Sequence, residues 1–272
     1  MGLGIRQKLG YIFSVNIAHI SGEKRKSNRI LENYKGRYKG GRCFIVCNGP
    51  SLKASDLDML KGEISFACNR VYGMYPETEW RPTFYALFDE GVAKLEGVLE
   101  GADSTPAEMK FFREQGRFIY HKFSGPSCYI HSWHSRRYLE NPRFSEDLTK
   151  GIYTIGTTTY VMIELARYMG FNRIYIIGAD HYYRNMVSKD GEVTVDKNAE
   201  SYFGNLKDTS QSLPAGIWEM EIAYEYAEKY SREHGFRIYN ATRGGHLEVF
   251  ERTDLDQVLA EGIMKKETKN RI

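Results

Sequence analysis

The sequence of 272 residues lacks several features that would place it in a known structural class. No apolar run approaches the ~20 residues that a membrane-spanning helix needs. The 26 glycines follow no three-residue period, which excludes a collagen-like chain, and an apolar fraction of 42% excludes a disordered one. A chain of this length and composition is expected to bury a substantial core in one large domain.

Cysteine is scarce, and the four cysteines, Cys43, Cys47, Cys68 and Cys128, follow no metal-ligand spacing. Cys43 and Cys47 fall on one face of a predicted strand, where the rise per residue separates them by about 13 Å. That distance is too long for a disulfide. We therefore expect buried free thiols in a reducing, cytoplasmic compartment.

Two nucleotide-binding motifs are also missing. No G-x-G-x-x-G follows the first predicted strand and no G-x-x-x-x-G-K-[ST] occurs, so neither a standard dinucleotide fold nor a P-loop kinase is expected. His121, His131 and His134 have no cysteine or acidic partner at a zinc-binding spacing. We expect structural or surface roles for them and predict no metal site.

The net charge of +3 conceals an uneven distribution. Residues 1–40 contain nine Lys and Arg against two acids, and this +7 leaves −4 for the other 232 residues. A generally basic nucleic-acid binder is therefore not expected. Within the basic segment, a loose apolar stripe at helical spacing is formed by Ile5, Leu9, Ile12, Phe13 and Ile17.

This N-terminal segment has two interpretations. One is an amphipathic helix on the anionic inner face of a membrane, and the other is a helix packed on the body with a solvated basic linker. A secretory signal is not expected, because Asn16 and His19 interrupt the apolar stretch. We predict a cytoplasmic protein with a basic helical extension (1–40), a catalytic domain (41–260) and a tail (261–272), and leave its oligomeric state open. A chain starting near Lys39 is then expected to keep nucleotide binding.

From residue 42 onward, strand and helix patterns alternate. Helical spacing predicts helices over 158–169 and 217–234. Thr157 or Thr158 is expected to cap the first of these, and Ser55 is expected to cap a short helix. A loop with a short helix is expected over 124–152, and a polar lid-like loop over 184–214. This alternation predicts an α/β fold with a doubly wound, mostly parallel sheet. Short apolar runs predict its strands at 43–47, 64–69, 83–88, 118–123, 173–180 and 236–242.

Ligands bind such sheets beyond the carboxyl ends of the strands. The residues there are short, polar or glycine, which suits a ribose, a base and a phosphate better than an apolar ligand. Each group alone is an ordinary turn or cap, and only their coincidence at one sheet edge predicts a site. They are Asn48, Gly49, Pro50, Ser51, Asn69, Arg70, Asp89, Glu90, residues 178–183 and residues 240–245, which include Thr242.

Two further features indicate chemistry at this edge. Thr157, Thr158 and Thr159 begin a predicted helix, whose dipole favours a bound anion. His181 follows Asp180 at a strand end, titrates near neutral pH and is a candidate general base. The adjacent Tyr182 and Tyr183 offer phenolic donors to a departing phosphate, a role that needs no metal.

Five ordered sequence blocks between residues 42 and 255 resemble the MptE-like domain family. They are FIVCNGPSLKASDLDML, FACNRVY, RPTFYALFDE, TTTYVMIELARYMGFNRIYIIGADHYY and FRIYNATRGGHLEVFERTDLD. The family is named for an archaeal 6-hydroxymethylpterin pyrophosphokinase, and it also occurs in bacterial surface-polysaccharide loci and in Maf flagellin glycosyltransferases. The blocks are more distantly similar to bacterial lipooligosaccharide sialyltransferases, which share an N-G-P-S-L turn, a C-N strand end and a G-x-D-x-Y strand end.

The sialyltransferase resemblance implies roles for individual residues. It implies that Asn48, Gly49 and Ser51 contact the nucleotide and that Asn69 lines the sugar or phosphate. It also implies that Thr157 or Thr158 lies near a donor carboxylate. Two tyrosines are implied near the leaving phosphate, Tyr182 and Tyr202.

The same resemblance places the general-base histidine of that pattern on Asn205, in the segment SYFGNLKDT. An amide cannot take a proton at neutral pH. Either His181, oriented by Asp180, replaces the base, or an acidic acceptor needs no base, or the reaction is different.

Three functions follow from these observations. The first is a glycosyltransferase without a tightly bound cofactor that moves a nucleotide-activated sugar, such as a CMP-linked nonulosonic acid, to a cell-surface glycan or lipid-linked acceptor. The second is an ATP- and Mg²⁺-dependent pyrophosphokinase acting on a pterin-like alcohol, with Asp89, Glu90 and Asp180 as the available carboxylates. The third is a non-catalytic nucleotide or glycan binding module, which Asn205 favours.

Overall fold

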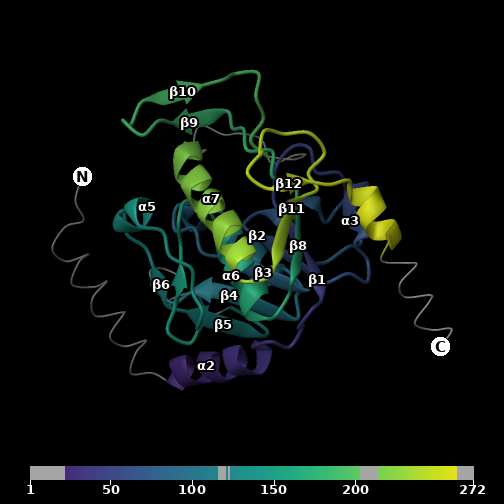
Figure 1. Cartoon of the computed structure of the whole chain (residues 1–272), viewed down its shortest axis with the longest axis vertical. Coiled ribbons are helices and arrows are strands. Elements are labelled where there is room, and N and C mark those ends of the chain that lie inside the picture. The colour runs from purple at the N-terminus through teal and green to yellow at the C-terminus, as the bar shows by residue number, and fades with distance from the viewer. Residues whose placement is uncertain (1–21, 116–120, 122, 203–213, 262–272) are drawn as a thin grey trace.

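The fold is an eight-stranded sheet with helices on both faces (Figure 1). The structure, a computed structural model, describes residues 22–115, 121, 123–202 and 214–261. The strand order is β12-β11-β8-β1-β2-β3-β4-β5, and every neighbouring pair is parallel. The predicted doubly wound parallel sheet is confirmed. Its strands are β1 (Arg42–Val46), β2 (Ser65–Cys68), β3 (Phe84–Leu87), β4 (Met109–Arg113), β5 (Ser127–Ile130), β8 (Arg173–Ile177), β11 (Arg237–Asn240) and β12 (Glu251–Arg252).

Two hydrophobic cores lie on opposite faces of this sheet. Along β1, Cys43 and Ile45 enter one core while Phe44 and Val46 enter the other, which explains why this strand is a continuous apolar run. All four cysteines are buried and free. The first core packs against α2 (Gly22–Tyr34), α5 (Arg137–Glu140), α6 (Thr158–Tyr168) and α7 (Ile217–Glu233), and the second against α3 (Ala54–Met59), α4 (Val98–Ser104) and the 3₁₀ turns η1 (Val71–Met74) and η2 (Val92–Lys94).

The two long predicted helices are confirmed within one residue at their ends as α6 and α7. Thr157 caps α6 as expected, because its hydroxyl accepts the N–H of Thr159 at 3.2 Å. The predicted cap at Ser55 is wrong, because α3 begins at Ala54 and Ser55 lies inside it. The Asp56 carboxylate, which accepts the Lys53 N–H at 3.3 Å, stabilises that helix start instead.

The region after residue 105 differs most from the prediction. Most of the expected strand at 118–123 lies outside the described residues, and β4 and β5 were not predicted. β4 was not predicted because it contains charged residues, which interrupt an apolar run. One of them, Lys110, is buried and donates to the carbonyl oxygens of Ala102 (3.3 Å) and Asp103. The short helix predicted within 124–152 is α5, and the rest of that predicted loop contains β5, the short strand β6 (Ser132–Trp133) and the start of β7 (Ile152–Tyr153). The predicted polar loop at 184–214 includes a hairpin, β9 (Asn185–Val187) and β10 (Val193–Val195).

Helix α2 corrects the predicted boundary at residue 40. Leu31 and Tyr34 are buried in the first core, and the Ser27 hydroxyl accepts the N–H of Tyr129 at 3.0 Å. Residues 22–40 are therefore part of the domain, and a chain starting near Lys39 would lose a packed helix. The apolar stripe predicted at residues 5–17 lies outside the described residues and stays a prediction.

Replacing Leu31 with Ala should lower the free energy of unfolding by about 2–5 kcal/mol, because Leu31 is 1% exposed and its removal leaves a cavity. Urea denaturation measures this loss. The neighbouring Glu32 is exposed, so Glu32→Ala should change stability by no more than about 0.5 kcal/mol. Equal stability of the two variants would contradict the packing of α2 on the sheet.

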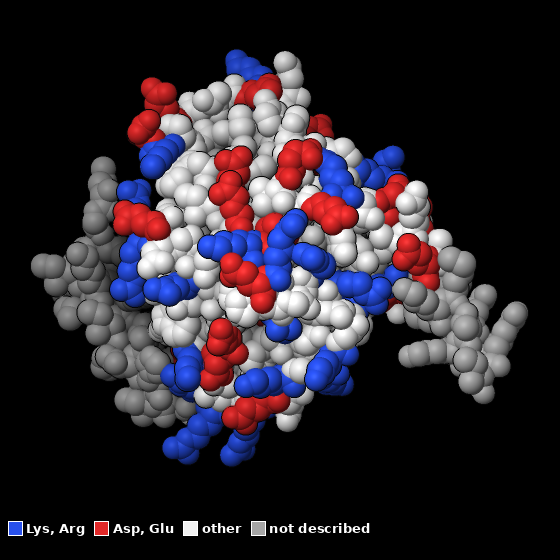
Figure 2. Space-filling model, in the orientation of Figure 1, with Lys and Arg blue, Asp and Glu red and all other residues white. Residues whose placement is uncertain are grey.

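The surface carries both signs of charge. Figure 2 shows Lys and Arg interspersed with Asp and Glu on the face in view, with basic side chains more frequent toward the end of the molecule where Figure 1 places α2. Among the described helices, none has the length and apolar character needed to cross a membrane.

Candidate active site

A cavity of about 510 Å³ lies at the carboxyl ends of the parallel strands, the edge at which the site was predicted. Residues following β1, β2, β3 and β8, the last residue of β4, and the starts of α6 and α7 form its walls. Most of the predicted site residues line it, namely Asn48, Gly49, Asn69, Asp89, Glu90, Thr157, Thr158, Thr159, residues 178–183 and Tyr202. Ser51 and Thr242 do not line the cavity but contact Asp180 and Ala179, which do. Asn205 lies outside the described residues.

Two asparagines offer acceptors to this cavity. Asn48 donates from Nδ2 to the Cys68 carbonyl oxygen at 3.1 Å, and its Oδ1 is buried without a hydrogen-bond partner. The Oδ1 of Asn69 is also buried without one, and Asn69 has a φ of 52°, which is uncommon outside glycine. Buried acceptors without partners cost free energy, so a ligand that donates hydrogen bonds would satisfy both.

The turn after β1 fits closely against the turn after β8. A Cβ on Gly49 would lie 1.9 Å from Asp180 Oδ2, so only glycine fits there. Its N–H donates to the Gly178 carbonyl oxygen at 2.8 Å, and the Ser51 hydroxyl donates to Asp180 Oδ2 at 2.8 Å. Burial raises the pKa of Asp180, and the two hydrogen bonds from Ser51 oppose that rise.

His181 has a different carboxylate partner from the one predicted. The carboxylate of Asp180 accepts from Ser51, whereas His181 Nε2 lies 3.6 Å from Oε1 of Glu221 on α7. Nε2 is buried without a hydrogen-bond partner, and His181 has a φ of 56°. Burial lowers the pKa of His181 below its ordinary value of 6.5 and Glu221 opposes this shift, so the imidazole is neutral at pH 7.

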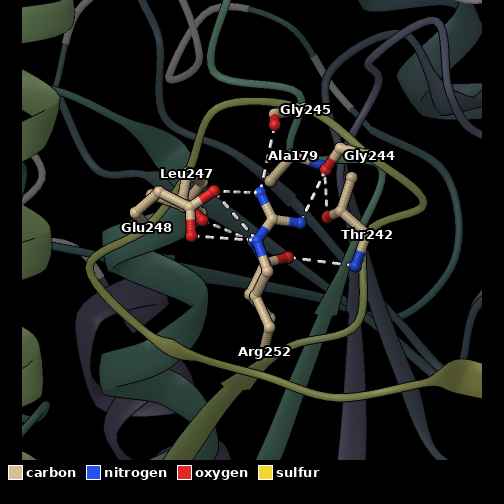
Figure 3. Close-up of polar contacts among 8 residues, drawn as sticks. Ala179, Thr242, Gly244, Gly245, Leu247, Glu248 and Arg252 are labelled. Atoms are coloured by element: carbon tan, nitrogen blue, oxygen red, sulfur yellow. Dashed lines mark hydrogen bonds and ion pairs between the residues drawn. The ribbon is translucent and has the colours of Figure 1, made fainter.

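A loop that follows β11 supports the Asp180 segment from behind (Figure 3). The Thr242 hydroxyl accepts the Ala179 N–H at 3.1 Å, and the His246 N–H donates to the Asp180 carbonyl oxygen at 2.8 Å. Thr242 therefore supports the Asp180 segment through its hydroxyl, and its predicted contact with the nucleotide stays a prediction. Arg252 fixes the loop by donating to the carbonyl oxygens of Gly244 (2.8 Å) and Gly245 (3.0 Å) and to the Glu248 carboxylate.

The tyrosines line the cavity in two ways. The Tyr182 hydroxyl donates to Asp196 at 2.9 Å, and the Tyr202 ring lies 5.6 Å from the Arg70 guanidinium. Tyr183 lies deeper, with burial raising its pKa, and its hydroxyl contacts the Met220 sulfur at 3.7 Å. A phosphate that binds Tyr182 would compete with Asp196 for the phenolic hydrogen.

The N-terminus of α6 supplies the helix dipole to this cavity. Thr157, Thr158 and Thr159 all line it, and the Thr159 hydroxyl lies 3.3 Å from the Cys47 sulfur. An 11-residue helix directed at a cavity in this way favours an anionic group there.

Sequence reasoning missed three charged residues of the site. Arg113 ends β4 and lines the cavity, while Glu219 lines it from the first turn of α7. Arg113 was hidden because its strand was not predicted. Glu221 follows His181 by forty residues on a polar helix, and no local pattern marks it as a partner.

A comparison with known protein families identifies the family of this chain. A family model described as 6-hydroxymethylpterin diphosphokinase MptE-like matches residues 14–186, more than half of the chain. The chain belongs to the MptE-like family. This confirms the resemblance drawn from the sequence blocks. No curated protein matches the chain.

Solved structures of low sequence identity are similar to this chain. The MAf glycosyltransferase from Magnetospirillum magneticum AMB-1 shares 14% identity at a TM-score of 0.49, over 87% of this chain and 39% of that one. This chain thus spans about two fifths of that structure's length. The sialyltransferase CstII from Campylobacter jejuni in complex with cytidine-5′-monophosphate shares 15% identity at a TM-score of 0.43, over 78% of this chain and 84% of that one. The complex of CstII with CMP-3FNeuAc shares 14% identity at a TM-score of 0.44, over 78% of this chain and 85% of that one.

Proposed function

We propose that this MptE-like protein is a transferase that moves a sugar from a nucleotide-activated donor to an acceptor hydroxyl. The observation that carries the proposal is the buried His181 beside Glu221, in the same cavity as the N-terminus of α6. A neutral imidazole can accept a proton, and a helix N-terminus stabilises an anion. Displacement at an anomeric carbon by an acceptor hydroxyl uses both functions.

The donor would bind through its nucleotide and phosphate. The unpartnered oxygens of Asn48 and Asn69 would accept hydrogen bonds from the ribose or base. As the acceptor oxygen bonds to the anomeric carbon, the bond to the phosphate oxygen breaks and its electron pair leaves with the nucleotide. The start of α6 and the hydroxyls of Tyr182 and Tyr202 would stabilise this departing charge.

His181 would take the proton that the acceptor hydroxyl loses. Glu221 lies 3.6 Å from Nε2, so a small movement of its side chain would let the tautomer with hydrogen on Nε2 donate to it, which would leave the Nδ1 lone pair as the proton acceptor. Glu221 thus has the orienting role that the sequence suggested for Asp180. With His181 as base, the asparagine at position 205 does not prevent catalysis.

Glu221→Gln should shift the acidic limb of the pH–rate profile to lower pH and reduce turnover roughly 10- to 100-fold. Glu221 raises the pKa of His181 against the lowering by burial, so without it His181 stays neutral down to a lower pH, but its ring is held less firmly. Initial rates between pH 4.5 and 8 measure both effects. The exposed Glu225 is the matched control, and Glu225→Gln should leave the limb in place. If the acidic limb of the pH–rate profile does not shift in Glu221→Gln, Glu221 does not influence the protonation of His181.

The family description favours a second candidate, a diphosphokinase that transfers a diphosphate from ATP. Such a reaction usually needs Mg²⁺ held by carboxylates. Within the described residues, no three His, Cys, Asp or Glu side chains lie close enough to hold a metal ion. Asp89 accepts the N–H groups of Gly91 (2.8 Å) and Val92 (3.1 Å) through Oδ1, and Asp180 accepts from Ser51, so part of each carboxylate is already used within the chain.

A thermal-shift screen with CMP, UDP, GDP and ATP tests the ligand class, since a ligand that binds only the native state raises its melting temperature. The proposal expects a shift from a nucleotide in buffer containing EDTA. A shift from ATP alone, and only with Mg²⁺, would favour the diphosphokinase. Binding without turnover across a donor panel would favour a non-catalytic module. The glycan or lipid-linked acceptor and the contact of residues 1–40 with the inner membrane face stay predictions.

A further inference from the structure

Arg113 occupies the end of the cavity farthest from His181 along the sheet. The cavity extends along the ends of β8, β1, β2, β3 and β4, and Arg113 is the last residue of β4. Four strand spacings separate β8 from β4, or roughly 19 Å between their backbones. His134 and Thr154 line the cavity as well, with the His134 ring nitrogen Nδ1 3.1 Å from the Thr154 carbonyl oxygen.

The charge of Arg113 is not balanced by the described part of the chain. Its side chain is partly buried, and its Nε is fully buried without a hydrogen-bond partner. No ion pair joins Arg113 to a carboxylate of the described residues, although Asp89, Glu90 and Glu219 also line the cavity. Asp89 directs its carboxylate to the N–H groups of its own turn. Among the described residues that line the cavity, Arg113 is the one lysine or arginine.

We infer that Arg113 binds an oxyanion of the donor substrate, either its phosphate or a carboxylate on its sugar. The Nε–H donor of Arg113 is withdrawn from water without a partner, which costs free energy, and an anionic ligand that accepts from it would recover that cost. The planar fork of N–H donors pairs with carboxylate and phosphate oxygens through two parallel hydrogen bonds. The start of α6 provides a separate positive centre, so the cavity suits a donor with more than one anionic oxygen group.

The variant Arg113→Met separates ligand binding from a structural role. Because no carboxylate partner is lost, its melting temperature without ligand should equal or exceed that of the wild type. Its affinity for the oxyanion-bearing ligand should fall roughly 10- to 100-fold, the loss expected for a charge-assisted hydrogen bond of about 1.5–3 kcal/mol. Arg113→Lys keeps the positive charge but lacks the planar guanidinium, so its affinity for that ligand should lie between those of the wild type and Arg113→Met. Arg237→Met is the matched control, since Arg237 is exposed at the opposite end of the strands.

Calorimetric titration with three ligands identifies the oxyanion. If Arg113→Met loses affinity for the preferred nucleotide but not for its nucleoside, Arg113 binds the phosphate. If nucleotide affinity is kept and the loss appears only with an acidic sugar nucleotide, CMP-nonulosonate or UDP-glucuronate, Arg113 binds the sugar carboxylate. Affinities within twofold of wild type for all three ligands, or a lowered melting temperature with unchanged affinity, would overturn the inference.

This inference rests on the proposed function for the identity of the donor, but its test measures binding and not turnover. Loss of affinity in Arg113→Met with no turnover in the wild type would keep the oxyanion site and overturn only the transferase. If no nucleotide binds, inorganic phosphate is the probe. It should then raise the melting temperature of the wild type and not that of Arg113→Met, and equal shifts would overturn the oxyanion site.

Discussion

Turnover of the donor should fall by about 10²–10⁴-fold in His181→Asn, while nucleotide affinity stays within about twofold of the wild type. Asparagine is chosen because His181 has a φ of 56°, a conformation that asparagine tolerates better than alanine. The substitution therefore removes the proton acceptor and keeps the backbone of the turn after β8. Rates of nucleotide release under saturating donor measure the loss.

His234→Asn is the control, because His234 is exposed at the end of α7, away from the cavity. Its rate of nucleotide release should match that of the wild type. The His181 variant should also lose the acidic limb of the pH–rate profile, since the group whose protonation stops the reaction is gone. Undiminished turnover in His181→Asn would remove His181 from the mechanism.

Gly49→Ala should abolish measurable nucleotide binding and lower the free energy of unfolding by about 1–3 kcal/mol. The added Cβ would meet Asp180 Oδ2 at 1.9 Å and the Gly178 carbonyl oxygen at 2.6 Å, so the turns after β1 and β8 must separate. This movement displaces Asn48 and the Asp180–His181 turn together. Calorimetric titration with nucleotide and urea denaturation measure the two losses.

The matched glycine is Gly22, where a Cβ would meet no atom within 4 Å and φ is not positive. Gly22→Ala should bind nucleotide and unfold like the wild type. If Gly49→Ala also binds like the wild type, the close contact between the two turns does not position the site.

The site's location could be predicted from the sequence because its physical basis is local. Strands buried on both faces, such as β1 and β8, are continuous apolar runs, and their ends share one edge of a parallel sheet. The cap of α6 could be predicted because it involves only Thr157 and a near neighbour in sequence. Most of the predicted residues line one cavity for this reason.

The remainder depends on contacts between distant segments. Asp180 and His181 are adjacent in sequence, but their side chains pair with Ser51 and Glu221 on other elements, which no local pattern reveals. The +7 charge of residues 1–40 suggested a segment outside the domain. Leu31 is nevertheless buried on the sheet, because one face of α2 packs there.

Nucleotide release from a donor panel, with and without EDTA, tests the proposed function most directly. The panel holds the sugar conjugates of whichever nucleotide gives the largest thermal shift, and the full chain and its His181→Asn variant are assayed side by side. We expect the wild type to release the nucleotide from at least one donor in EDTA and the variant to be slower by about 10²–10⁴-fold. Formation of AMP from ATP only in the presence of Mg²⁺, with no release from any sugar nucleotide, would contradict it.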